Sequence, residues 1–235
     1  MTSALRKISM KSNGSDRNYL PSRPRRLPNI QHANSVHVVE EFGVLVRDFV
    51  INPSLIVPTE LRLPGDDSNL FLQANNGNVR AEVWVVDARS RCYHKLPFYS
   101  EAIAPGKVFI TVNALASYFE NRIVIHSLSG CIGSITVTAS SDVALYLPAN
   151  FVGPVNVVGG RGTKFSDGIK PLISTVLEVA GRQVYFMGSF PGKITEGEAW
   201  SGSTVTIKVQ NCDDATATLY RSDEFQARST ECITQ

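Results

Sequence analysis

The chain has 235 residues, 43% of them hydrophobic, and a formal net charge of +2. A domain of this length buries roughly 70% of the surface that its unfolded chain exposes, so we expect one domain with a sizeable core. No run of about 18 apolar residues occurs, which excludes a membrane-spanning helix at this stage. The near-neutral total charge does not indicate a nucleic-acid-binding face.

Residues 1–35 form a basic segment that we expect to be a disordered tail. They carry seven basic residues against the single acid Asp16, with few large apolar residues and no hydrophobic period. Three prolines around Arg23, Arg25 and Arg26 make this stretch stiff and extended. A solvated tail is the plainest interpretation. A nuclear address, an arm for an acidic partner such as nucleic acid, and an organelle-targeting signal stay open.

From residue 36 to residue 222 the sequence predicts a single all-β domain, followed by a frayed C-terminal tail at 223–235. Short apolar runs are separated by breaks every dozen to twenty residues, a spacing typical of a sandwich, a barrel or a solenoid. The one helical candidate is 114–120, with Asn113 as its cap. We expect strands at 36–39, 42–51, 70–74, 79–83, 108–112, 123–127, 132–138, 143–147, 155–158, 176–179, 183–187, 204–209 and 216–220.

Asn76-Gly77 predicts a tight turn between two of these strands. A two-residue hairpin turn needs positive φ at both central positions and therefore favours Asn-Gly. The hairpin would pair 70–74 with 79–83 and place their apolar side chains on one face. Phe71 is the misfit on the polar face, which also carries Trp84.

Four cysteines, Cys92, Cys131, Cys212 and Cys232, are widely spaced, without the close pairs that structural zinc usually needs. The N-terminus lacks the apolar stretch of a secretory signal. We therefore expect an intracellular protein with reduced, mostly buried thiols, although the sequence does not decide their disulfide state.

No catalytic constellation emerges, and we expect neither an enzyme nor a cofactor or metal site. A serine hydrolase would need a serine on a sharp turn with a histidine base, and His126 lies on a strand where a packed side chain is the simpler explanation. Residues 159–164 resemble a phosphate loop but lack its Gly-Lys-Ser/Thr ending and a following helix. Aromatic side chains could instead stack on sugars, and the weak candidates for ligand contact are Trp84, Trp200 and Tyr93.

Several segments together resemble an uncharacterised domain family abundant in mushroom-forming fungi, distantly similar to bacterial putative-adhesin domains. The likeness covers about 36–222; each motif is weak alone, and their order is specific. Cys212 and the hinge at 160–162 depart from the family pattern. The segments are 49–58, 69–72, 76–81, 142–154, 165–169, 184–190 and 203–209, followed by Asn211.

The resemblance implies a right-handed β-solenoid and no established activity, so it transfers no functional residue. We favour an adhesin-like β-solenoid, with an antiparallel β-sandwich, which the Asn-Gly turn supports, as the alternative. The function is expected to be that of a non-enzymatic interaction or scaffold domain. A carbohydrate-binding or polysaccharide-cleaving β protein is the alternative, and the partner, a protein or a glycan, is not defined by the sequence.

Overall fold

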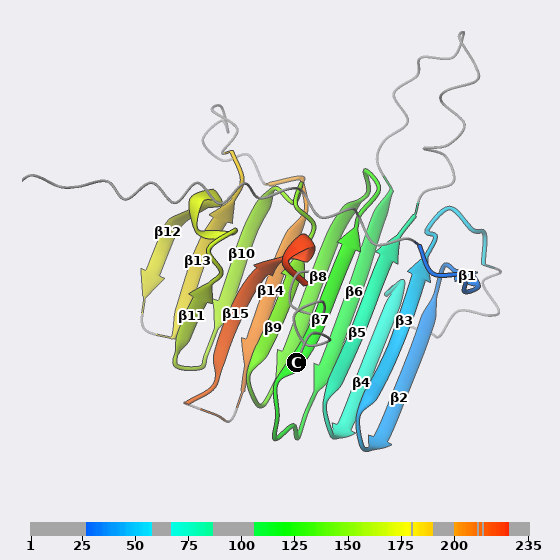
Figure 1. The fold of residues 1–235 in the computed structure, drawn as a ribbon, viewed down its shortest axis with the longest axis horizontal. Helices are drawn as coiled ribbons and strands as arrows, with labels where there is room; N and C mark the ends of the chain where they lie inside the picture. The colour runs from blue at the N-terminus through cyan, green and yellow to red at the C-terminus, as the bar shows by residue number, and fades with distance from the viewer. Residues whose placement is uncertain are drawn as a thin grey trace, which may run out of the picture.

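The computed structural model describes residues 27–57, 67–86, 106–179, 181–189, 200–210, 212 and 214–225. These residues are nearly all β and form two sheets (Figure 1). Sheet A has the strand order β1-β3-β5-β7-β9-β15-β11, and sheet B has the order β12-β13-β10-β14-β8-β6-β4-β2. Within the described part of the chain, no helix has the length and apolar character needed to cross a membrane.

Most of the expected strands are confirmed, several with longer bounds, whereas the strand expected at 42–51 is divided, because residue 42 ends one strand and residues 45–51 form the next. In sheet B they are β2 (Val36–Phe42), β4 (Leu70–Asn76), β6 (Lys107–Ala114), β8 (Ile132–Ala139), β10 (Gly153–Val158), β12 (Ile173–Val179), β13 (Arg182–Met187) and β14 (Thr204–Val209). In sheet A they are β3 (Leu45–Ile51), β5 (Val79–Val85), β7 (Asn121–Ser127), β9 (Val143–Leu147) and β15 (Thr216–Arg221); β1 (His32–Ala33) and β11 (Gly162–Phe165) also lie in this sheet and were not expected. A 3-10 helix, η2 (Lys170–Leu172), precedes β12.

The chain alternates between the two sheets. Each of β2, β4, β6, β8, β10 and β14 lies in sheet B and is followed by a strand in sheet A, and we call each such pair of strands a coil. Neighbouring coils pair in parallel in both sheets, for example β4 with β6 and β5 with β7. Antiparallel pairing occurs where β13 meets β10 and β12. The sheets are therefore parallel with a mixed edge.

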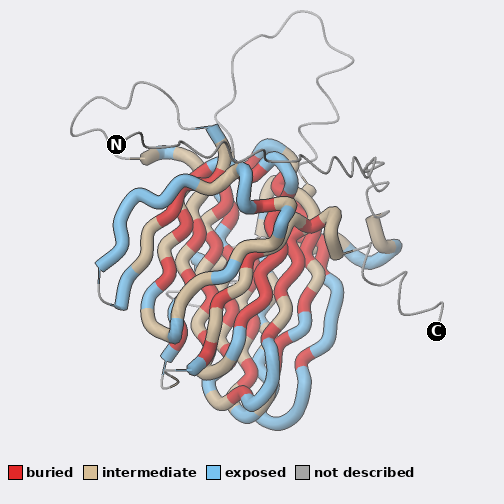
Figure 2. The backbone as a smooth tube through the Cα atoms, turned by 60° about the vertical axis from the view of Figure 1, so that its left-hand side comes forward, coloured by how far each residue is buried: buried red, intermediate tan, exposed pale blue. Residues whose placement is uncertain are grey.

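Because the parallel strands pair in register, apolar residues on neighbouring strands lie side by side. These residues form columns whose side chains face the interior. One column runs through Leu72, Val112, Val137 and Ile207, which are all fully buried. Leu145 lies opposite in sheet A and is also fully buried. Figure 2 shows buried positions alternating with more exposed ones along the strands, as side-chain alternation in a strand requires. The core lies between the two sheets.

The hairpin predicted at Asn76-Gly77 is wrong. β4 and β5 belong to different sheets, so the turn carries the chain from one sheet to the other. Neither residue has positive φ; instead, a Cβ on Gly77 would lie 1.6 Å from the Gly43 carbonyl oxygen. Glycine is needed here because the turns of two coils touch. The expected inward set was nevertheless correct, because strands facing each other across a core bury the same alternate residues: Leu70, Leu72, Ala74, Val79, Ala81 and Val83.

Asparagine side chains join the turns of successive coils. Asn121 is fully buried, accepts a hydrogen bond from the Val79 backbone N–H at 2.9 Å and donates to Ser117 Oγ at 3.0 Å. At the other side of the stack, Asn69 accepts from the Phe109 N–H at 2.9 Å. A buried backbone N–H without a partner costs about 1–3 kcal/mol, so these amides stabilise the turns between sheets.

Three other expectations need correction or lie outside the described residues. Residues 115–120 form turns and bends rather than a helix, because Tyr118 and Phe119 are exposed and give a short helix no packed face. The stretch expected to be tail includes β1, which pairs with β3, and residues 222–225 form a helical turn instead of a frayed end. Residues 1–26 and 226–235, with Arg23, Arg25 and Arg26, lie outside the description.

One coil is out of sequence order. β14 lies between β8 and β10, and β15 lies between β9 and β11. In Figure 1, these orange strands separate green β8 and β9 from yellow-green β10 and β11. The coil formed by β14 and β15, which we call the inserted coil, therefore completes the stack between coils that precede it in the chain.

The first coil, at one end of the stack, carries charged side chains at interior positions. In the first coil, Glu40 is in register with buried Ala74, and Arg47 is in register with buried Ala81. Both charged residues are exposed. Inward-pointing charges on edge strands hinder edge-to-edge association, so they close this end of the core against another β-edge.

A truncation within the inserted coil tests the core column. We expect Ile207→Ala to reduce the free energy of unfolding by about 2–5 kcal/mol, because it leaves a cavity in a fully buried column. The control is Thr206→Ala, one residue away on the outer face, which should stay within about 0.5 kcal/mol of the parent chain. Urea denaturation measures both, and equal losses would contradict the assigned inward face.

The end charges are tested by two matched substitutions on β2. Glu40→Val removes an inward charge, whereas Glu41→Val removes the same charge from the outer face. We expect concentration-dependent association in Glu40→Val, measured by sedimentation velocity, because the edge becomes uniformly apolar. If Glu41→Val associates equally, loss of charge rather than its inward position is the cause.

Candidate functional site

An aromatic cluster covers part of the outer face of sheet A. Trp84 on β5 stacks on His126 of β7, with ring centroids 4.2 Å apart and planes 14° apart. Tyr146 of β9 stacks on Tyr220 of β15 at 4.5 Å. Phe225, in the helical turn after β15, meets Tyr146 edge-on at 5.3 Å. Val124, Ala144 and Tyr146, with Tyr220 and Phe225 packed against them, make a second, small hydrophobic core.

A β-bulge positions His126 in this cluster. Val83 pairs with Ile125 and Trp84 with Ser127, so His126 is the extra residue on β7, and bulges of this kind re-aim a side chain. Its Nε2 lies 2.9 Å from Glu82 Oε2, and the His126 side chain is 7% exposed. A carboxylate can orient a catalytic imidazole in this way, but here the ring face is occupied by Trp84. The geometry fits the packed strand residue expected from the sequence.

The three residues named as weak ligand-contact candidates are not brought together. Trp84 is 4% exposed on the outer face of sheet A, and its indole Nε1 has no hydrogen-bond partner. Trp200 is half-buried beside sheet B, where it donates to the Ser203 carbonyl at 2.9 Å and meets Phe186 edge-on at 5.2 Å. Tyr93 lies outside the described residues.

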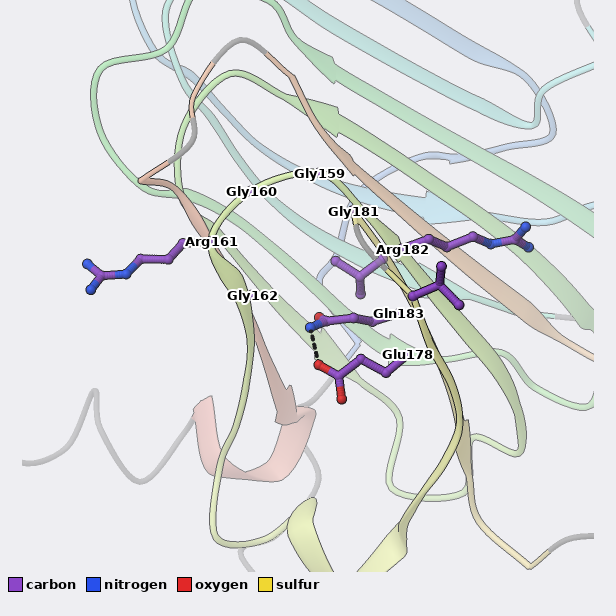
Figure 3. A pocket seen from close by; sticks show the side chains of 10 residues that line it. Gly159, Gly160, Arg161, Gly162, Glu178, Gly181, Arg182 and Gln183 are labelled. Carbon is purple, nitrogen blue, oxygen red and sulfur yellow. Dashed lines mark hydrogen bonds between the residues drawn. The ribbon is translucent and has the colours of Figure 1, made fainter.

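A pocket of about 310 Å³ lies between the glycine-rich turn after β10 and the β12–β13 hairpin (Figure 3). The side chains of Arg161 and Arg182 point away from each other and from the pocket. Gln183 instead receives a hydrogen bond from Thr163 at 2.7 Å and donates to Glu178 at 3.1 Å. The turn leads from strand to strand, as expected, and the pocket presents a polar end of the stack without converging cations.

The outer face of sheet B carries rows of hydroxyl and amide side chains. In the central row, Thr111, Thr136, Thr206 and Asn156 stand in register on four adjacent strands, and all four are half-buried. In-register neighbours on parallel strands are about 4.8 Å apart, so the side chains of this row are regularly spaced. The row on one side contains Ser134 and Thr204 with exposed Phe109, and the row on the other side contains Asn113, Thr138 and Lys208 with exposed Val158.

Sequence reasoning missed this surface, which we call the hydroxyl face. The alternating hydroxyls of β8, at Ser134, Thr136 and Thr138, were a visible signal. Alternation shows that they share one side of a strand, but their alignment with Thr206 depends on which strand pairs with β8. That pairing joins segments about 70 residues apart, as Thr136 and Thr206 show.

The described residues contain no group of three or more His, Cys, Asp or Glu side chains placed to hold a metal ion. Cys131 is buried and Cys212 is half-buried, while Cys92 and Cys232 lie outside the described ranges. The pKa of Asp167 is lowered because Lys170 Nζ donates to its carboxylate at 2.7 Å and adds a nearby positive charge. That exposed pair is a surface feature of the turn before η2.

A family profile for a domain of unknown function, DUF7330, matches residues 34–224. The chain belongs to the DUF7330 family. The matched range covers all six coils of this DUF7330 domain and every strand except β1. No curated protein and no solved structure matches the chain. The family assignment therefore identifies the domain and leaves its function to be argued from its surfaces.

The aromatic cluster is tested at Trp84. We expect Trp84→Ala to cost about 3–5 kcal/mol of unfolding free energy, because a large buried ring is lost. Trp84→Phe should cost clearly less, because the indole Nε1 that it removes has no partner. Thermal and urea unfolding compare the two variants. Equal losses would contradict the assignment of the stabilisation to packing of the aromatic ring.

Proposed function

We propose that this DUF7330 domain is a non-enzymatic interaction domain, an adhesin-like β-solenoid that binds its partner with the hydroxyl face. The observation that carries the proposal is the row of Thr111, Thr136, Thr206 and Asn156 on adjacent strands. Hydroxyl groups donate and accept hydrogen bonds, and amides do both at separate atoms. A rigid sheet holds these groups at fixed spacing and so reduces the ordering cost of binding.

The chemistry of this face favours a neutral, polar partner. Its central row has no ionised side chain, so it lacks the basic surface that attracts a phosphate backbone. β-branched threonines have few rotamers and lose little side-chain entropy when covered. The outer face of sheet A differs, because its aromatic cluster is already packed against Phe225.

A photo-crosslinking experiment tests the proposal. A crosslinking residue replaces Thr136 on the hydroxyl face or, as control, Arg80, which is exposed on the outer face of sheet A. We expect one recurrent partner to be captured from position 136 and not from position 80. Adding Thr206→Arg should abolish the capture, since it places a charge in the same row. Equal capture at both positions would refute the hydroxyl face as the binding surface.

Carbohydrate binding is the second candidate, favoured by the position of Trp200. Its ring packs on Gly202, where an added Cβ would lie 2.5 Å from a ring atom, and against Phe186. This holds a half-buried indole close to Ser203, the residue that precedes β14. An aromatic platform next to hydroxyl groups is a suitable arrangement for stacking and hydrogen bonding to a sugar.

Cellulose, chitin and soluble glucans are the probes for this candidate. If glycan binding occurs, Trp200→Ala should weaken it at least about tenfold, the ratio produced by about 1.4 kcal/mol, whereas Trp84→Phe should leave it unchanged. Release of reducing sugar in the same samples would indicate cleavage. No binding to any of these probes would remove the carbohydrate candidate and leave the protein-binding candidate in place.

A further inference from the structure

The inserted coil occupies a slot whose four walls come from other coils. β14 pairs with β8 over six register positions and with β10 over four. β15 pairs in parallel with β9 and with β11. Without this coil, β8, β9, β10 and β11 would each lose a partner strand, and their backbone N–H and C=O groups would have to be satisfied by water or by another chain.

The slot between these coils requires apolar side chains at defined positions. The inserted coil fills it with Val205, Ile207, Ala217 and Leu219, all fully buried. These side chains continue the core columns of the neighbouring coils, for example between Val137 and Val157. A segment that fills the slot must therefore combine two strands, the correct length between them and this apolar pattern. A second copy of the chain supplies such a segment.

The connection to the inserted coil does not confine it to its own chain. β13 ends at Met187 and β14 begins at Thr204, and both strands are neighbours of β10. The gap is two strand spacings, about 10 Å, whereas residues 188–203 could span roughly 50 Å if extended. Connections of 2–6 residues are common between adjacent elements, so this one is much longer than the gap requires.

The ends of the stack offer a poorer route to self-association. Glu40 and Arg47 place charges at interior positions of the first coil. At the other end, Thr163, Gln183 and Glu178 form a hydrogen-bonded polar chain. A copy approaching either end would bury charged or amide groups. The internal slot requires no such burial, because exchange reproduces the contacts of a single chain.

We propose that the inserted coil is an exchange element, through which one copy of the chain completes the fold of a second copy. Reciprocal exchange gives a dimer, and serial exchange gives a longer assembly. Each assembly presents several hydroxyl faces, and linked binding sites raise avidity. The exchange does not depend on the proposed binding function, since it follows from the strand order alone.

Disulfide trapping tests the exchange in the full chain. In a background with the native cysteines replaced by alanine, Thr136→Cys and Thr206→Cys are placed on separate, differently tagged chains. These positions are in register on β8 and β14, and a spacing of about 4.8 Å between strands permits a disulfide. The chains are unfolded, mixed, refolded at high concentration and oxidised with oxidised glutathione. We expect a disulfide-linked heterodimer that dilution before refolding suppresses.

Two controls make the result decisive. Thr111→Cys mixed with Thr136→Cys tests β6 and β8, which are in register but do not exchange, and should give no heterodimer. The double variant Thr136→Cys/Thr206→Cys should crosslink within one chain when refolded dilute, which confirms the register. If it does so and the mixed chains still yield no heterodimer, the proposal is wrong. Equal heterodimer from the control pair, or no crosslink in the double variant, would also overturn it.

Discussion

In-register parallel pairing between coils is the constraint on which the rest of this structure depends. It places each side chain directly beside its counterpart on the next strand, so an apolar position in one coil requires an apolar position in its neighbours. Leu72, Val112, Val137 and Ile207 form one such column. The same stacking brings turns into contact, where Gly77 permits a close approach and Asn121 satisfies a buried N–H. A one-residue slip would turn every column outward.

Pairing also creates the two different outer surfaces. On sheet A, aromatic residues from four strands meet and pack with Phe225, so that surface stabilises the fold. On sheet B, the same stacking aligns threonines that keep part of their surface in solvent. The packed aromatic face is therefore part of the fold's core, and the proposed binding surface is the partly exposed face of sheet B. It also explains why a histidine next to a carboxylate, His126 with Glu82, is a packing feature.

The order of the coils has a consequence for folding. β8 and β9 cannot gain their second neighbours until the chain has passed through β10–β13 and returned as β14 and β15. Contacts between segments distant in sequence carry a loop-closure cost and slow folding. A chain in which this coil is not yet in place has unpaired strand edges in both sheets. That state links the topology of the DUF7330 domain to its capacity for exchange between copies.

The amino-acid sequence determined the class of structure, the strand positions and which side chains face inward, because alternation is a local property of the backbone. The sequence did not determine which strands pair with one another. Leu70 and Leu72 would be buried with Ala81 and Val83 in a hairpin or across two sheets, so one pattern fits both arrangements. The burial of Trp84, the row through Thr136 and Thr206, and the inserted coil follow from pairing between distant segments. Only the tertiary structure decides that pairing, because its energy comes from neighbours that a local pattern does not specify.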